Sequence, residues 1–244
     1  MARRFSDSYF PSYSQPTTAE IQTRAEKTAR QARKKGKELH PIVVSGRAIT
    51  KKWWGNAWCG NLERYADYES RIDRGKRYVR SGAVVDLQIE AGHIVARVQG
   101  SRRTPYTVTV EIDPMNTERC EAIVAQCARK IENLEALLSG SFPEELKGLF
   151  TARDGLFPTP KEIHFGCTCP DWAYMCKHVA AALYGVGARL DDEPLLFFEL
   201  RGIDAGRFID TAVANRVEIM LENAKNASDR IIANRDIERL FGAL

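Results

Sequence analysis

Twelve residues of this chain contain four side chains that bind transition metals, and they constrain the fold more than any other segment. The four are Cys167, Cys169, Cys176 and His178, spaced as Cys-x-Cys, six intervening residues, and Cys-x-His. Three thiolates and one imidazole form a common tetrahedral set for a structural Zn²⁺ ion. Such a set leaves no coordination position for a catalytic water, so the pattern predicts a binding protein rather than an enzyme.

The residues around the four candidates suit a compact metal-binding loop. Gly166 and Pro170 flank the first pair, and both residue types favour a sharp bend. The second pair precedes a helix-like run, residues 179–190, whose N-terminal dipole would favour a thiolate. The segment also holds half of the six cysteines and one of the four histidines. The alternatives are a chance grouping of core cysteines and a redox-active Cys-x-Cys pair.

Composition places the chain among intracellular globular proteins. Its 244 residues are 44% hydrophobic and 28% charged, and no apolar run approaches the roughly 20 residues that cross a bilayer. No apolar stretch follows the N-terminus, so we expect no signal peptide, a cytoplasmic location and no membrane partner. Cys59, Cys120 and Cys127 are expected in the core, because a nucleophilic Cys59 would need a base and no histidine lies nearby in sequence.

Charge is divided unevenly along the chain. Residues 1–110 carry 21 Lys/Arg against 10 Asp/Glu, whereas residues 111–244 carry 15 against 22. The first part therefore has a net charge of +11 and the second of −7. This asymmetry indicates a polyanionic partner for the first part, with a basic arm that only maintains solubility as the alternative.

Hydrophobic periodicity predicts an α+β fold, in which an antiparallel β-meander is accompanied by helices and a small Cys3His zinc knuckle packed on a helix. Strands are expected at residues 82–89, 93–98 and 106–112, where apolar and polar residues alternate, and at 161–165. Helices are expected at residues 19–38, 49–67, 117–138, 143–150, 177–190, 193–200, 206–223 and 228–242.

These elements suggest five segments. They are a basic N-terminal arm or helix (1–45), a Trp helix with the antiparallel sheet (46–115), a helical segment (116–160), the zinc finger (161–192) and C-terminal helices (193–244).

Basic residues near glycine and tryptophan are the candidates for nucleic-acid binding. They are Arg33, Lys34, Lys35, Lys37, Lys51, Lys52, Arg74, Lys76, Arg77, Arg80, Arg102 and Arg103. Each group has a plainer interpretation. The run at 24–37 also fits a solvated helix, Trp54 and Trp58 fit a core at helical spacing, and residues 71–80 fit an exposed basic loop that turns at Gly75.

The pattern of the four metal ligands, followed by the apolar residues 179–183, resembles the SWIM zinc finger. The resemblance is specific over about residues 160–190, and Cys167, Cys169, Cys176 and His178 match the four ligand positions of the family. More weakly, residues 51–58, 67–69, 74–75, 78–88 and 99–102 resemble the N-terminal region of bacterial SWIM-containing proteins.

The resemblance implies a module for interaction with DNA or protein, and bacterial members are often linked to Swi/Snf-class helicase-like ATPases. Two functions follow as expectations. The first is a zinc-stabilised accessory protein that binds nucleic acid, with DNA favoured. The second is a subunit that docks onto a helicase-like ATPase. An enzyme is not expected, because the sequence shows no phosphate-binding P-loop, no paired metal-binding carboxylates and no Ser-His-Asp spacing.

Overall fold

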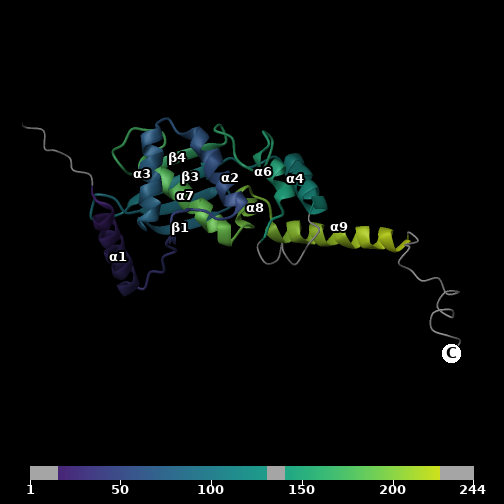
Figure 1. Ribbon diagram of the computed structural model, residues 1–244, viewed down its shortest axis with the longest axis horizontal. Helices are drawn as coiled ribbons and strands as arrows, with labels where there is room; N and C mark the ends of the chain where they lie inside the picture. The colour runs from purple at the N-terminus through teal and green to yellow at the C-terminus, as the bar shows by residue number, and fades with distance from the viewer. Residues whose placement is uncertain (1–15, 131–140, 226–244) are drawn as a thin grey trace, which may run out of the picture.

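The computed structural model describes residues 16–130 and 141–225, and within them it shows the expected α+β fold (Figure 1). Its helices are α1 (Thr18–Lys34), α2 (Trp53–Leu62), η1 (Glu63–Tyr65), α3 (Glu69–Arg80), α4 (Thr117–Lys130), η2 (Glu144–Leu146), α6 (Lys147–Thr151), α7 (Lys177–Asp192), α8 (Leu196–Leu200) and α9 (Ala205–Lys225). Its strands are β1 (Val84–Glu90), β2 (His93–Val98), β3 (Tyr106–Ile112) and β4 (Ile163–Cys167). The helix expected at 228–242 and the end of the one expected at 117–138 lie outside the described residues. In the described part, no helix has the length and apolar character needed to cross a bilayer.

The four strands form one antiparallel sheet in the order β1-β2-β3-β4. Alternate residues of β2 and β3 are buried, as the sequence pattern predicts for a sheet with one covered face. The last strand comes from much later in the chain and pairs with β3, where Val108 lies opposite Cys167. This pairing places the first candidate metal ligand at the edge of the sheet.

Helix α7 packs on the covered face of the sheet, and α2 and α3 pack on the side of α7 that faces away from the sheet (Figure 1). Nearly every side chain of α7 from residue 178 to 187 is buried, so α7 is the central helix of the body. The expected Trp helix is confirmed, because the indoles of Trp54 and Trp58 donate to the carbonyls of Leu190 (2.8 Å) and Leu183 (3.0 Å) of α7. Both indoles are therefore core groups with satisfied hydrogen bonds.

The segment from 71 to 80 departs from the expectation of an exposed loop with a glycine turn. It is helical, and Gly75 lies in the middle of α3 where the helix meets α7. A Cβ atom at position 75 would lie 2.5 Å from Cβ of Ala180. The glycine therefore permits two helices to approach closely, and the apolar spacing of Ile72 and Val79 was the signal for this helix.

Helix α1 is anchored to the body rather than solvated on all sides. Its Ile21 is 3% exposed, and its N-terminus has a capping box between Thr17 and Glu20. Arg24 donates to the carbonyl of Ser101 (2.8 Å), and Thr28 donates to Gln99 (2.9 Å). These bonds bring α1 to the turn between β2 and β3.

A buried arginine joins the sheet to the C-terminal helices. Arg201 is 2% exposed, and its guanidinium pairs with Glu162 at 2.9 Å just before β4. Burial alone would raise the pKa of Glu162, but hydrogen bonds from Thr159 and Arg201 outweigh it and lower the pKa to about 2. The carboxylate therefore stays charged and neutralises the buried guanidinium.

Replacing Gly75 with alanine is expected to lower the free energy of unfolding by on the order of 1–2 kcal/mol. The new methyl group would overpack the α3–α7 contact, at a cost that exceeds the gain in helix propensity. The matched control is Gly60→Ala in α2, where a Cβ atom meets nothing within 4 Å, and there a gain of up to about 1 kcal/mol is expected. Urea unfolding of both variants is the measurement, and equal stability of the two would refute the close-packing role.

Candidate metal centre

The four predicted ligands meet at one place. Cys167 ends β4, Cys169 lies in the turn that follows, Cys176 is the N-cap of α7, and His178 lies in its first turn. Their ligand atoms all lie within 4.8 Å of one another. Nδ1 of His178 is 3.9 Å from Sγ of Cys167 and 4.0 Å from Sγ of Cys176. The cluster could therefore hold one metal ion.

The spacing of the donor atoms fits a tetrahedral ion. Zn–S bonds of about 2.3 Å and Zn–N bonds of about 2.0 Å give tetrahedral edges of roughly 3.5–3.8 Å, close to the two sulfur–nitrogen distances. Cys176 and His178 are 1% exposed, while Cys167 and Cys169 are partly buried. Three sulfurs and one imidazole would hold the ion with no donor supplied from outside the chain.

The imidazole of His178 is held in position by its neighbours. Tyr106 of β3 stacks on the ring with centroids 4.3 Å apart, and Tyr78 of α3 meets it edge-on at 5.5 Å. A Cβ atom at Gly100 would come within 2.9 Å of Nε2, so glycine is needed where the β2–β3 turn passes the ring. These contacts direct Nδ1 toward the three sulfurs.

The electrostatics of the cluster favour a cation. Contacts with the Cys167 thiol, the His178 ring and the Val179 N–H lower the pKa of Cys176 well below that of a free thiol despite its burial. The hydrogen bond that the Cys167 thiol donates to the Cys176 sulfur also raises the pKa of Cys167. Burial lowers the pKa of His178, which keeps the imidazole neutral, as a metal ligand must be.

Two aspartates hold the finger loop, residues 167–178, against α3. Asp67 accepts from the backbone N–H of Tyr174 (2.8 Å) and of Met175 (3.2 Å). Asp171 of the loop pairs with Nε of Arg71 in α3 at 3.0 Å. Asp171 also accepts from the backbone N–H of Ala173, two residues later, which is a local turn contact typical of aspartate.

Part of the predicted basic surface lies beside the cluster. Arg74 and Arg77 of α3 line one cavity of about 130 Å³ together with the start of α1 and with Lys177 of α7, which was not among the predicted residues. No acidic residue is among the residues that line it. The guanidinium of Arg102 lies 5.1 Å from the ring of Tyr106, the same ring that stacks on His178. Cations from α3, α7 and the β2–β3 turn therefore lie near the candidate metal site.

Most of the other basic candidates lie elsewhere or are engaged in other contacts, and only Arg103 is in the same turn as Arg102. The backbone N–H groups of Lys51 and Lys52 bond to Asp191 at the C-terminal end of α7, about 21 Å along the helix from Lys177. Lys76 pairs with Glu63 at 2.8 Å, and Arg80 donates to the carbonyl of Arg47. The exposed Arg33, Lys34, Lys35 and Lys37 lie at the far end of α1, and Arg103 is exposed in the β2–β3 turn.

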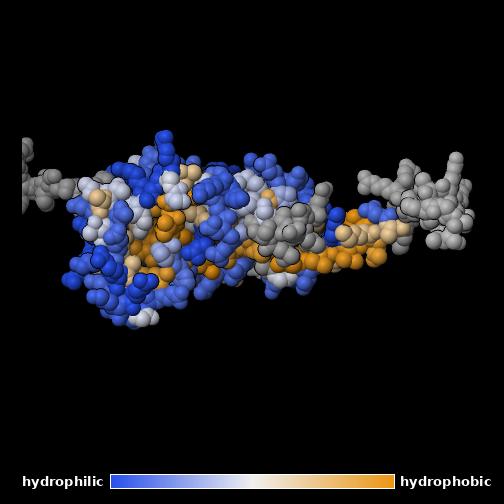
Figure 2. Space-filling view, turned by 60° about the horizontal axis from the view of Figure 1, so that its bottom comes forward, coloured by the Kyte–Doolittle hydropathy of each residue, from blue (hydrophilic) through white to orange (hydrophobic). Residues whose placement is uncertain are grey.

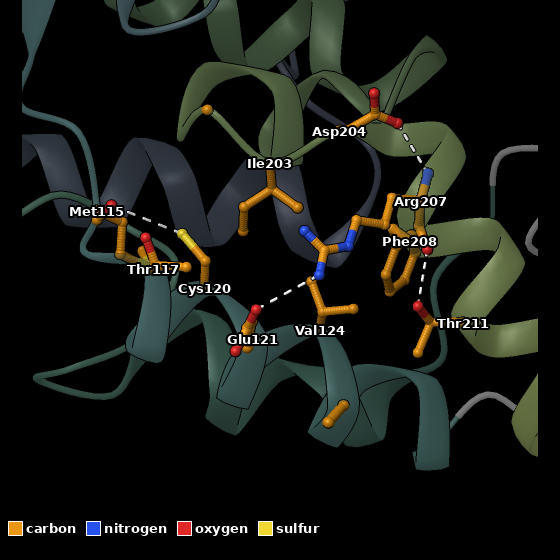
Figure 3. Close-up of a pocket in the computed structure, with 12 residues that line it drawn as sticks. Met115, Thr117, Cys120, Glu121, Val124, Ile203, Asp204, Arg207, Phe208 and Thr211 are labelled. Carbon is orange, nitrogen blue, oxygen red and sulfur yellow. Dashed lines mark hydrogen bonds and ion pairs between the residues drawn. The ribbon is translucent and has the colours of Figure 1, made fainter.

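The three cysteines outside the cluster differ in burial. Cys59 and Cys127 are buried, as predicted, and burial raises the pKa of each thiol to about 12. Cys120 is half-buried and lines a cavity of about 370 Å³ between α4 and α9 (Figure 3). An ion pair between Arg207 and Glu121 crosses the rim of this cavity.

Comparison with known proteins finds one relative. The chain is 33% identical over 184 residues to an uncharacterized protein, Rv2102, from Mycobacterium tuberculosis. The match covers 75% of this chain and 65% of that protein, slightly less than two thirds of its length. No family model matches the chain. No solved structure matches it.

Replacing Cys176 with serine is expected to abolish tight metal binding and to destabilise residues 160–190. One of four donors is lost, and the free energy of metal binding contributes to folding. Metal analysis of the purified chain is the measurement, with Cys120→Ser as the matched control outside the cluster, which should retain one metal ion per chain. One tightly held ion in Cys176→Ser would disprove the ligand assignment.

Proposed function

We propose that this chain is a zinc-stabilised accessory protein that binds nucleic acid through a SWIM-type finger and the basic residues beside it. The single observation that carries the proposal is the group of cations around the Cys3His cluster: Arg74, Arg77, Lys177 and Arg102. They come from three elements that are far apart in sequence and that meet at the finger.

The zinc ion would have a structural role. It would link the end of β4 to the start of the central helix α7, using four donors from the chain itself. With every coordination position occupied by protein, we propose a binding role rather than catalysis. The finger then acts as a scaffold that fixes the basic side chains in place.

The chemistry of the basic group favours phosphate. Arginine presents a fork of N–H donors that matches phosphate oxygens, and Arg74 and Arg77 occupy adjacent turns of one helix face. In the described part of the chain, no ion pair neutralises Arg74, Arg77 or Lys177. Contacts of this kind release counterions, so the affinity should fall steeply with salt. We favour DNA as the nucleic acid.

The double variant Arg74→Ala/Arg77→Ala is expected to weaken DNA binding and to lower the slope of log K against log salt by about 2, because two phosphate contacts are lost. Electrophoretic shifts at several salt concentrations, with DNA and RNA in parallel, are the measurement. The matched control is Lys51→Ala/Lys52→Ala at the opposite end of α7, which should leave the slope unchanged. Failure of the wild-type chain to bind either nucleic acid at about 50 mM salt would refute the proposal.

A second candidate function is docking onto a Swi/Snf-class helicase-like ATPase, and α9 favours it. This helix projects from the body, and hydrophobic side chains gather along it (Figure 2). Val213, Val217, Met220 and Leu221 are between 41% and 59% exposed. At 3.6 residues per turn, they face away from the side on which Phe208 and Ala212 are buried. A helix with two apolar faces is typical of a contact with another protein.

The double variant Val217→Asp/Leu221→Asp is expected to eliminate co-purification of a helicase-like ATPase from native cells, because it places charges on the exposed apolar face. Asn223→Asp on another face of α9 is the matched control and should retain the partner. A wild-type chain that purifies as a free monomer would count against docking and would leave the nucleic-acid proposal untouched.

A further inference from the structure

One tryptophan of the finger loop is not part of the core. The side chain of Trp172 is 79% exposed, in contrast to Trp54 and Trp58, which are 2% and 1% exposed. Tyr68, the N-cap of α3, meets its ring at 5.5 Å in an edge-on arrangement and is itself 43% exposed. The two rings form an aromatic pair on the surface of the candidate metal centre.

The residues next to the aromatic pair are anchored by an ion pair and by hydrogen bonds. Trp172 follows Asp171, which is paired with Arg71, and Tyr68 follows Asp67, which binds the backbone of Tyr174 and Met175. Both aspartates next to the rings are therefore committed to internal contacts. The chain next to each ring is thereby anchored, while the rings themselves remain open to solvent.

The aromatic pair and the basic cavity lie along the same helix. Arg74 and Arg77 follow Tyr68 by six and nine residues in α3, which corresponds to about 9 and 13.5 Å of helix rise. Lys177, the third cation of that cavity, follows Trp172 by five residues in the finger loop. Along the axis of α3, a rise of about 9 Å corresponds to roughly two to three nucleotides stacked at about 3.4 Å each.

We propose that this surface binds a single strand, with an unpaired base stacked on Trp172 beside Tyr68 and the adjacent phosphates held by Arg74, Arg77 and Lys177. The inference rests on the proposed nucleic-acid function and names the form of nucleic acid that the site takes. Aromatic rings stack on the faces of bases, and these faces are accessible in a single strand but covered in a duplex. Phosphate contacts alone would serve both forms equally.

Fluorescence titration tests the inference, because Trp172 is the most exposed of the four tryptophans. A short oligothymidylate strand is expected to quench the emission, and a duplex of the same length to bind at least fivefold more weakly. Trp172→Ala should weaken single-strand binding about tenfold or more, which is the effect typical of a lost stacking contact. Trp172→Phe should bind within about threefold of wild type, since a ring remains to stack, while the change in emission is lost.

Metal content and thermal unfolding confirm that each variant is folded. Equal binding of strand and duplex, or unchanged single-strand affinity in Trp172→Ala, would overturn the inference. If either result were obtained and Arg74→Ala/Arg77→Ala still lowered the salt slope, the proposed nucleic-acid function would stand without the single-strand inference. Absence of any nucleic-acid binding would overturn both.

Discussion

The contact between the end of β4 and the first turn of α7 is the interaction on which the rest of this structure depends. Cys167 reaches it because β4 pairs with β3, and Cys176 and His178 reach it because they begin the central helix. Three sulfurs at this distance from a neutral imidazole repel one another when ionised, so a cation is the natural counterpart of the cluster. The ion would thereby fix where α7 starts on the sheet.

Helix α7 transmits that constraint to the remainder of the body. It contacts the sheet on one side and α2 and α3 on the other, and small residues on both sides of these contacts allow close approach. Gly75 meets Ala180, and the indoles of Trp54 and Trp58 donate to carbonyl groups near the end and in the middle of α7, respectively. The N-terminus of α7 is thus positioned by the cluster, and its C-terminus by the Trp helix.

The packing around α7 also brings the basic side chains together near the cluster. Arg74 belongs to a helix that packs on α7, Lys177 to the first turn of α7, and Arg102 to the turn that passes His178. Packing that serves the centre therefore also assembles the basic group. The apolar face of α9 lies in a part of the molecule that projects away from the centre, so the two proposed contacts would use separate surfaces.

The sequence by itself determined the ligand set, the strands and the core tryptophans, because these depend on local spacing: Cys-x-Cys with Cys-x-His, alternation in the strands, and Trp54 with Trp58 one helical turn apart. It misjudged residues 71–80, because Gly75 reads as a turn until the partner Ala180 is known. Only the tertiary structure decided which cations lie near the cluster, separating Lys51 and Lys52 from Arg74 by the length of α7. It also decided that Trp172 is exposed, because exposure depends on which elements cover a side chain, and those elements come from distant parts of the chain.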